Sequence, residues 1–170
     1  MGFVYELAAG KGKKLAQSGV ARAILGDWQT NGVFSAYSGR PFTVGADGGP
    51  LNAPGNSQTA DQVKPDVQKV GSLDEFYDRT AFAPVTETRF GTTGRNILRG
   101  PGAVNFDLSL FRNFPIGERV TLQFRAESFN LTNTPHFENP GTNVYAASFM
   151  RITSAVADQR TFRFGLRAQW

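Results

Sequence analysis

The segment Thr161-Phe-Arg-Phe-Gly-Leu-Arg-Ala-Gln-Trp170 decides the fold class. Its even-numbered positions are apolar and its odd-numbered positions are not, without an exception along the segment. A period of two residues is the pattern of a β-strand whose two faces meet different surroundings. One face carries Arg163 and Arg167, and the apolar face carries Phe162, Phe164, Leu166, Ala168 and Trp170.

The same alternation recurs upstream. Segment 120–130 sets Leu122, Phe124 and Ala126 against a polar face that includes Arg125 and Glu127. Segment 104–114 alternates until Phe111 and Arg112 interrupt it, and Pro115 and Gly117 predict a tight turn between these two segments. Weaker patterns add two more strands and a short helix over 15–25. The sequence therefore predicts five strands, over 3–7, 28–42, 104–114, 120–130 and 161–170.

The connections between these strands alternate in length. Two long segments rich in Gly, Pro, Asn and Asp, 45–102 and 132–159, alternate with the shorter connections 8–27 and 113–119. Compact soluble domains rarely contain a loop of about sixty residues without periodicity. Short turns on one side and long loops on the other are typical of outer-membrane barrels. The predicted fold is all-β: a transmembrane antiparallel β-barrel segment of about five strands, an open curved sheet if alone, with long extracellular loops.

A membrane barrel gives each strand face a separate role. The apolar face of 161–170 is predicted to contact lipid, and Arg125, Glu127, Arg163 and Arg167 to face the lumen, because Arg on the lipid face costs about 2–4 kcal/mol near the midplane. Three aromatics, Trp28, Phe114 and Trp170, are predicted to lie at one rim, the periplasmic one. Alternation alone leaves open a soluble β-sandwich, such as a carbohydrate-binding module. A small complete barrel is the third alternative, although known barrels need about eight strands.

Composition and motifs argue against other functions. The net charge of +4 comes from 18 basic and 14 acidic residues, spread singly instead of in a basic stripe, so we expect no nucleic-acid binding. The single histidine, His136, and the absence of cysteine give no metal-ligand spacing or Cys/His pair. No Gly-x-Ser-x-Gly or phosphate-loop motif occurs. We therefore expect no enzyme activity, no metal and no cofactor.

Three aromatic residues of the first long loop, Phe76, Tyr77 and Phe82, are candidate ligand contacts, since such rings stack on sugars. They also suit packing of the loop onto itself, which we favour because a loop of this length needs an apolar anchor.

Several motifs together resemble the last strands of TonB-dependent receptors. They are Gly26-Asp-Trp-Gln29, Ser38-Gly-Arg-Pro-Phe-Thr43, Gly94-Arg-Asn-Ile-Leu-Arg-Gly-Pro-Gly102, Phe106-Asp-Leu-Ser-Leu-Phe-Arg-Asn-Phe114, Leu122-Gln-Phe-Arg-Ala-Glu127 and Phe164-Gly-Leu-Arg167. The resemblance covers nearly the whole chain. It is strongest to the large receptors with an N-terminal carboxypeptidase-regulatory-like domain that are found in soil bacteria such as Acidobacteria.

The resemblance implies a barrel of about 22 strands, closed by an N-terminal plug, that imports bulky nutrients with energy relayed from the inner membrane. Residues 1–170 contain no plug, energy-coupling box or signal peptide, so we expect the C-terminal portion of such a receptor, which does not transport on its own. Phe162, Phe164, Leu166, Ala168 and Trp170 resemble the signal read by the barrel-assembly machinery. The expected location is the bacterial outer membrane. The expected partners are outer-membrane lipid, the assembly machinery, the remaining barrel with its plug, and an unidentified nutrient.

Overall fold

The computed structural model describes residues 1–10, 12–15, 18–51 and 58–170. They form two compact units. The sheet unit consists of Met1–Ala36, Val104–Thr134 and Asp158–Trp170. The loop unit consists of Tyr37–Ala103 and Pro135–Ala157.

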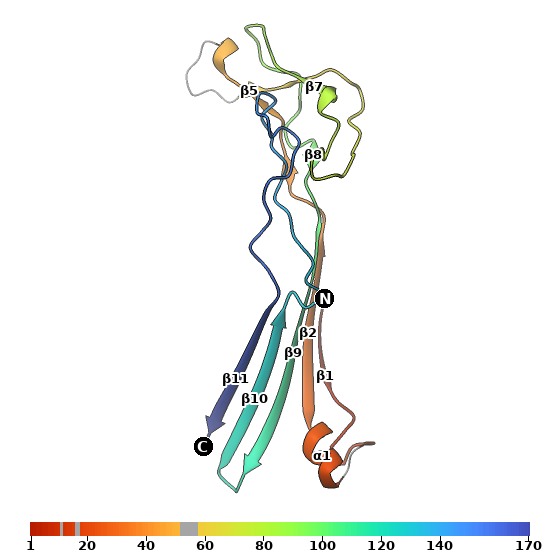
Figure 1. Cartoon of the computed structure of the whole chain (residues 1–170), viewed down its shortest axis with the longest axis vertical. Coiled ribbons are helices and arrows are strands. Elements are labelled where there is room, and N and C mark those ends of the chain that lie inside the picture. Colours follow the sequence, from red (N-terminus) through yellow and green to blue (C-terminus); the bar gives the residue numbers. More distant parts are fainter. Residues whose placement is uncertain (11, 16–17, 52–57) are drawn as a thin grey trace. The chain divides into compact units, whose positions relative to one another are not determined.

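Five strands build the sheet unit, in the order β1-β2-β9-β10-β11 (Figure 1). This open antiparallel sheet confirms the predicted fold class. Its strands coincide with the five predicted ones to within a few residues, except for the last five residues of 28–42. The bounds are Gly2–Glu6 (β1), Trp28–Tyr37 (β2), Ala103–Ile116 (β9), Val120–Phe129 (β10) and Thr161–Gln169 (β11).

The hairpin between β9 and β10 sits at the predicted turn but is tighter than predicted. Strand β9 continues through Pro115 to Ile116, which pairs with Val120. The turn between them begins at Gly117, whose φ of +67° is a conformation that glycine adopts without strain. The short turn fixes the register of the two strands.

Two aromatic side chains and the chain's last residue lie at the hairpin end of the sheet. Phe114 lies opposite Leu122, and Trp28 begins β2 directly after α1. Gln169 pairs with Thr121, which places Trp170 beside the same turn. The predicted grouping of Trp28, Phe114 and Trp170 at one rim therefore agrees with the topology.

The other end of β10 is closed by Asn130, which is 4% exposed and has a φ of +48°. Its side-chain amide donates hydrogen bonds to the carbonyl oxygens of Thr134 (3.0 Å) and Asp158 (2.8 Å). Its side-chain oxygen accepts one from the Thr134 backbone N–H (3.0 Å). One asparagine thus ties the end of β10 to the segment that enters β11.

A short helix, α1 (Gly19–Leu25), lies between β1 and β2. It begins later than the predicted helix over 15–25, and residues 16 and 17 of that prediction lie outside the described residues. The helix ends where the Gly26 backbone N–H donates to the Arg22 carbonyl (2.9 Å). Over the described ranges, no helix is long and apolar enough to cross a membrane.

The predicted strand over 28–42 is wrong in its last five residues, 38–42. Strand β2 ends at Tyr37, and β3 (Pro41–Phe42) pairs instead with β8 (Leu98–Arg99) in the loop unit. The cause is a backbone crossing at Gly39, where a Cβ atom would overlap the carbonyl of Gly100. Glycine is required wherever two backbones approach this closely.

The loop unit has a core that combines residues of both long segments, whereas the sequence predicted packing only within the first of them. Val44, Val85 and Met150 are fully buried, and the Phe76 backbone N–H donates to the Met150 carbonyl (2.8 Å). Residues from 45–102 and from 132–159 therefore pack together instead of forming two irregular loops. The short elements of the unit, besides β3 and β8, are β4 (Gly45–Ala46), η1 (Gly49–Leu51), β5 (Gln58–Thr59), β6 (Asp61–Gln62), η2 (Arg79–Ala81) and β7 (Phe82–Ala83).

Candidate functional site: the two faces of the sheet

The cross-strand register sorts the side chains of β10 and β11 onto two faces. On the first, called the apolar face, Leu122, Phe124 and Ala126 lie opposite Ala168, Leu166 and Phe164, in that order. This face is open: Phe164 is 73% exposed and Leu166 is 70% exposed. A β-sandwich buries such a face against a second sheet, so the exposures are the opposite of what that alternative requires.

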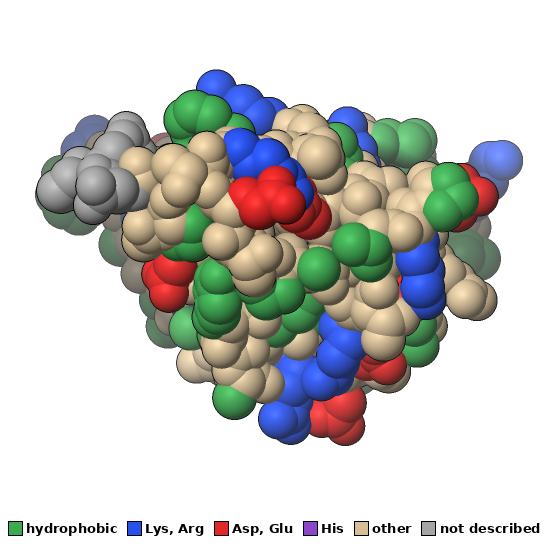
Figure 2. All heavy atoms as spheres, turned by 90° about the horizontal axis from the view of Figure 1, so that it is seen from above, with side chains coloured by type: hydrophobic (Ala, Val, Ile, Leu, Met, Phe, Trp, Pro, Cys, Tyr) green, Lys and Arg blue, Asp and Glu red, His purple; other side chains and the backbone are tan. Residues whose placement is uncertain are grey.

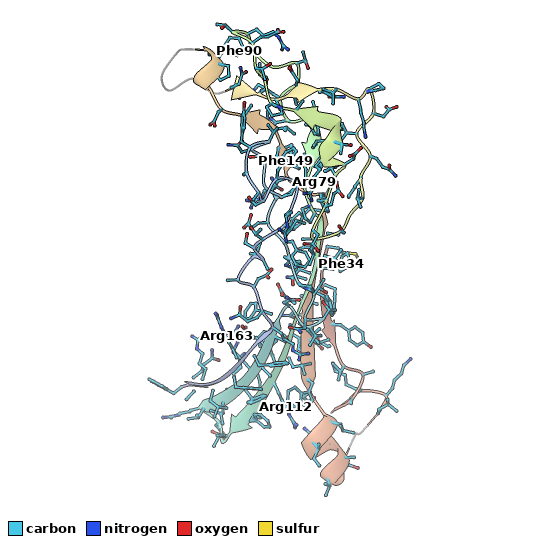
Figure 3. The ribbon with its side chains drawn as sticks, turned by 45° about the horizontal axis from the view of Figure 1, so that its top comes forward. Phe34, Arg79, Phe90, Arg112, Phe149 and Arg163 are labelled. Carbon is cyan, nitrogen blue, oxygen red and sulfur yellow. The ribbon has the colours of Figure 1, made fainter. Side chains whose placement is uncertain are left out.

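The second, called the polar face, carries the four charged residues that the sequence assigned to one side. Glu127 lies opposite Arg163, and Arg167 lies opposite Gln123. Arg125 donates to Glu127 over 3.1 Å, and its guanidinium group lies 4.9 Å from the centre of the Phe111 ring. With three guanidinium groups and one carboxylate, this part of the face is positively charged. Figure 3 labels Arg163 on β11.

A depression of about 540 Å³ opens in the sheet unit, where several side chains of the polar face meet. Two pairs of amides face it: Gln29 donates to Asn31 (3.2 Å), and Gln123 donates to Asn113 (3.1 Å). Amide and guanidinium groups bind water and polar solutes through directed hydrogen bonds. The lining residues are Glu6, Lys13, Asp27, Trp28, Gln29, Asn31, Phe111, Arg112, Asn113, Gln123 and Arg125.

Each of the two residues that interrupt the alternation of β9 lies on the face opposite to the one that its side-chain type predicts. Phe111 lies on the polar face opposite Arg125, and Arg112 lies on the apolar face opposite Phe124. No functional role was predicted for either residue. A cation on the apolar face requires compensation.

That compensation comes from the end of α1. Arg112 is 9% exposed, and its Nη1 and Nη2 atoms donate to the carbonyl oxygens of Ile24 (3.0 Å) and Arg22 (3.3 Å). Its guanidinium group also lies 4.5 Å from the Phe114 ring centre and 5.7 Å from that of Trp28. The carbonyl end of a helix carries partial negative charge, and aromatic faces attract cations. These groups hold the charge without a carboxylate partner in the described part of the chain (Figure 3).

The fold agrees with a comparison with known families. A family model for the outer membrane beta barrel domain matches residues 1–163 of this chain. The chain belongs to this family. Neither a curated protein nor a solved structure matches it. The outer membrane β-barrel domain is located in the bacterial outer membrane, as the sequence predicted.

The outermost strand of the barrel domain has an open edge. In the described ranges β11 pairs with β10 on one side and with no strand on the other. All its residues are exposed, and Trp170 beyond it is 94% exposed. Its backbone donors and acceptors along that edge are therefore available for pairing with another strand.

The candidate ligand contacts of the barrel domain lie in the core of the loop unit. Phe76, Tyr77 and Phe82 are 5%, 8% and 6% exposed, and the Tyr77 hydroxyl donates to the Arg99 carbonyl (2.9 Å). Phe82 meets Phe149 edge to face, with ring centres 6.2 Å apart. Rings buried to this degree offer no face for stacking on a sugar. The structure thus supports the packing interpretation of these residues and corrects the suggestion of ligand contact.

The single histidine of the barrel domain is also buried in the loop unit. His136 is 5% exposed, and its backbone carbonyl accepts from the Val156 backbone N–H (2.8 Å). Among the residues that the structure describes, no group of three His, Asp or Glu side chains is placed to hold a metal ion.

Charge pairs hold parts of the loop unit together. Arg89 donates to both carboxylate oxygens of Asp61 (2.8 and 2.7 Å), which lowers the pKa of Asp61. Hydrogen bonds from Lys64 (2.6 Å) and Thr80 lower the pKa of Asp78 to about 2. Figure 2 shows charged side chains of both signs dispersed among small hydrophobic patches on the visible face. These pairs hold together segments of the loop unit that are distant in the sequence.

Proposed function

We propose that this barrel domain is the C-terminal portion of a TonB-dependent receptor that takes up a bulky nutrient, acting with the remaining barrel strands and a plug. The observation that carries the proposal is the open depression beside the polar face. Small barrels fill their interior with side chains, whereas large barrels enclose a channel or a plugged lumen. A depression lined by amide and guanidinium groups is suited to the wall of a wide lumen that holds polar contents. The resemblance of motifs along the chain supports the assignment to the receptor family.

The two faces take their roles from this arrangement. The apolar face, with Phe162, Phe164, Leu166 and Trp170, contacts lipid, because hydrocarbon accepts these side chains and rejects charge. The polar face, with Arg125, Glu127, Arg163 and Arg167, lines the lumen. Two long segments, 37–103 (the first excursion) and 135–157 (the second excursion), connect strand ends that are opposite the hairpin and α1, so we expect these loops to be extracellular and the hairpin end to be periplasmic.

The open edge of β11 supports the proposed assembly partner. An extended strand with free backbone groups is recognised by adding a further strand, with side-chain pockets supplying specificity. The barrel-assembly machinery binds the open edge of β11 in this way. A strand of the remaining barrel then replaces the machinery at that edge. The domain itself carries out no chemical reaction and binds no cofactor.

Nutrient uptake by the producing bacterium tests the proposal. Cells with and without the coding region for residues 1–170 are supplied with labelled oligosaccharides, peptides and metal chelates. We expect the deletion, or a protonophore, to abolish uptake of one of them, and restoration of the wild-type region to recover it. Unchanged uptake of all of them, with the wild-type protein present in outer membranes, would falsify the receptor proposal.

A matched pair of substitutions assigns the effect to the lumen. Arg163→Glu reverses a charge on the polar face, so we expect it to change the uptake rate. Phe162→Leu alters the preceding residue on the apolar face and is expected to leave the rate unchanged. Equal effects of the two variants would show that uptake does not depend on the polar face.

A further inference from the structure

Helix α1 exposes large apolar side chains. Val20 is 75% exposed, Ile24 is 61% exposed and Leu25 is 57% exposed. Val20 and Ile24 are four residues apart and therefore lie on one side of the helix. Leu15, ahead of the helix, is 65% exposed as well. An exposed apolar cluster on a short segment marks a surface that another apolar body covers.

The carbonyl end of α1 is fastened to the apolar face of the sheet. The indole N–H of Trp28 donates to the Ile24 carbonyl (2.9 Å), and Arg112 donates to the same oxygen. The Trp28 ring in turn meets Phe124 edge to face, with ring centres 5.9 Å apart. These contacts place the helix on the side of the sheet that carries Phe124. Figure 1 shows α1 at the hairpin end of the strands.

Its position along the strands is that of a membrane interface. Trp28 and Phe114 flank Arg112, and aromatic residues gather where barrel strands pass from hydrocarbon to headgroups. The polar part of α1 suits the same level: Arg22 is partly exposed, with its Nε 3.9 Å from the Asp27 carboxylate. A long basic side chain extends from an apolar surface toward water or phosphate.

We propose that α1 is an interfacial anchor, which binds phospholipid of the periplasmic leaflet with Val20, Ile24 and Leu25 among the upper acyl carbons and Arg22 among the headgroups. Helices with an apolar side and a basic residue bind membranes in this way, lying in the interface. Lipid is the occupant because the exposed side chains continue the apolar face of a barrel that is located in the outer membrane. The anchor rests on this location and on the proposed periplasmic position of the hairpin end, and not on nutrient transport.

Site-directed spin labelling in isolated outer membranes tests the anchor. Residues 1–170 contain no cysteine, so each introduced cysteine is the single labelling site within this domain, and a sample without the introduced cysteine measures background labelling. Ile24→Cys reports on α1, and Glu118→Cys, in the exposed turn at the same end of the sheet, is the matched polar control. Phe164→Cys on the apolar face is the lipid reference. The measurement is the collision rate of each label with oxygen, which is enriched in lipid, relative to a water-soluble nickel complex.

We expect the oxygen-to-nickel ratio at position 24 to be several-fold higher than at 118 and close to that at 164. A water-like ratio at 24 with a lipid-like ratio at 164 overturns the anchor and leaves the barrel orientation intact. Water-like ratios at both positions overturn the anchor together with the lipid-facing assignment. Low collision rates with both reagents at 24, with dipolar broadening between labels, identify a second copy of the chain as the occupant and also overturn the proposal.

Discussion

The assignment of the two faces predicts that neighbouring positions of β9 respond oppositely to the same substitution. Leu110 lies on the apolar face opposite Ala126 and is 37% exposed, whereas Ser109 lies on the polar face opposite Glu127. Leu110→Arg places a cation in hydrocarbon near the middle of the strand, which costs about 2–4 kcal/mol. In water, a substitution at such an exposed position changes stability by about 0.5 kcal/mol or less.

The matched variant Ser109→Arg gains a carboxylate partner across the strands, worth about 0.2–1 kcal/mol. The free energies of unfolding of the two variants should therefore differ by at least about 2 kcal/mol. At 1.4 kcal/mol for each factor of ten, this corresponds to about a thirtyfold difference in the unfolding equilibrium constant. The assay is protease protection in isolated outer membranes as the urea concentration rises. If both variants unfold at the same urea concentration as the wild type, the apolar face does not contact lipid.

Three further predictions concern single side chains. Met150→Ala, at a fully buried position, should destabilise the loop unit by about 2–5 kcal/mol and speed its hydrogen exchange, whereas Val70→Ala, at a position that is 52% exposed, should not. Lys64→Gln should raise the pKa of Asp78 from about 2 toward 3.8 in a carboxyl NMR titration. Because folding lowers this pKa, the stabilisation by Asp78 is complete above pH 3.8 and is lost as the pH falls toward 2. An unchanged Asp78 pKa in the Lys64→Gln variant would show that Lys64 does not cause the shift. Asn130→Ala removes three part-buried hydrogen bonds that join the end of β10 to Thr134 and Asp158, so it should destabilise that end by about 1–3 kcal/mol, measured by amide exchange, and wild-type protection would refute this role.

The strands were predictable because apolar and polar residues alternate along a strand whose two faces meet different surroundings. The alternation of 161–170 fixes which side chains share a face, and the structure pairs them across β10 in that phase. The four charged residues predicted to share a face do so for the same reason. Such information is local, and reading it requires no knowledge of the remaining chain.

The features that the sequence did not predict depend on residues far apart in the chain. Strand β2 ends because the backbone at Gly39 passes against Gly100, and no nearby residue signals that approach. Arg112 sits on the apolar face because carbonyls 88 and 90 positions away accept its hydrogen bonds. The core of the loop unit joins Met150 to residues before position 100 in the same way.

The shared core of the loop unit constrains how such proteins diversify. Phe149 and Met150 come from the second excursion and pack against Phe76 and Phe82 of the first. A recombination event that replaces residues 135–157 alone would remove two large side chains from a close-packed interior and leave a void. A laboratory chimera that grafts new loops onto this sheet therefore has to transplant both excursions together.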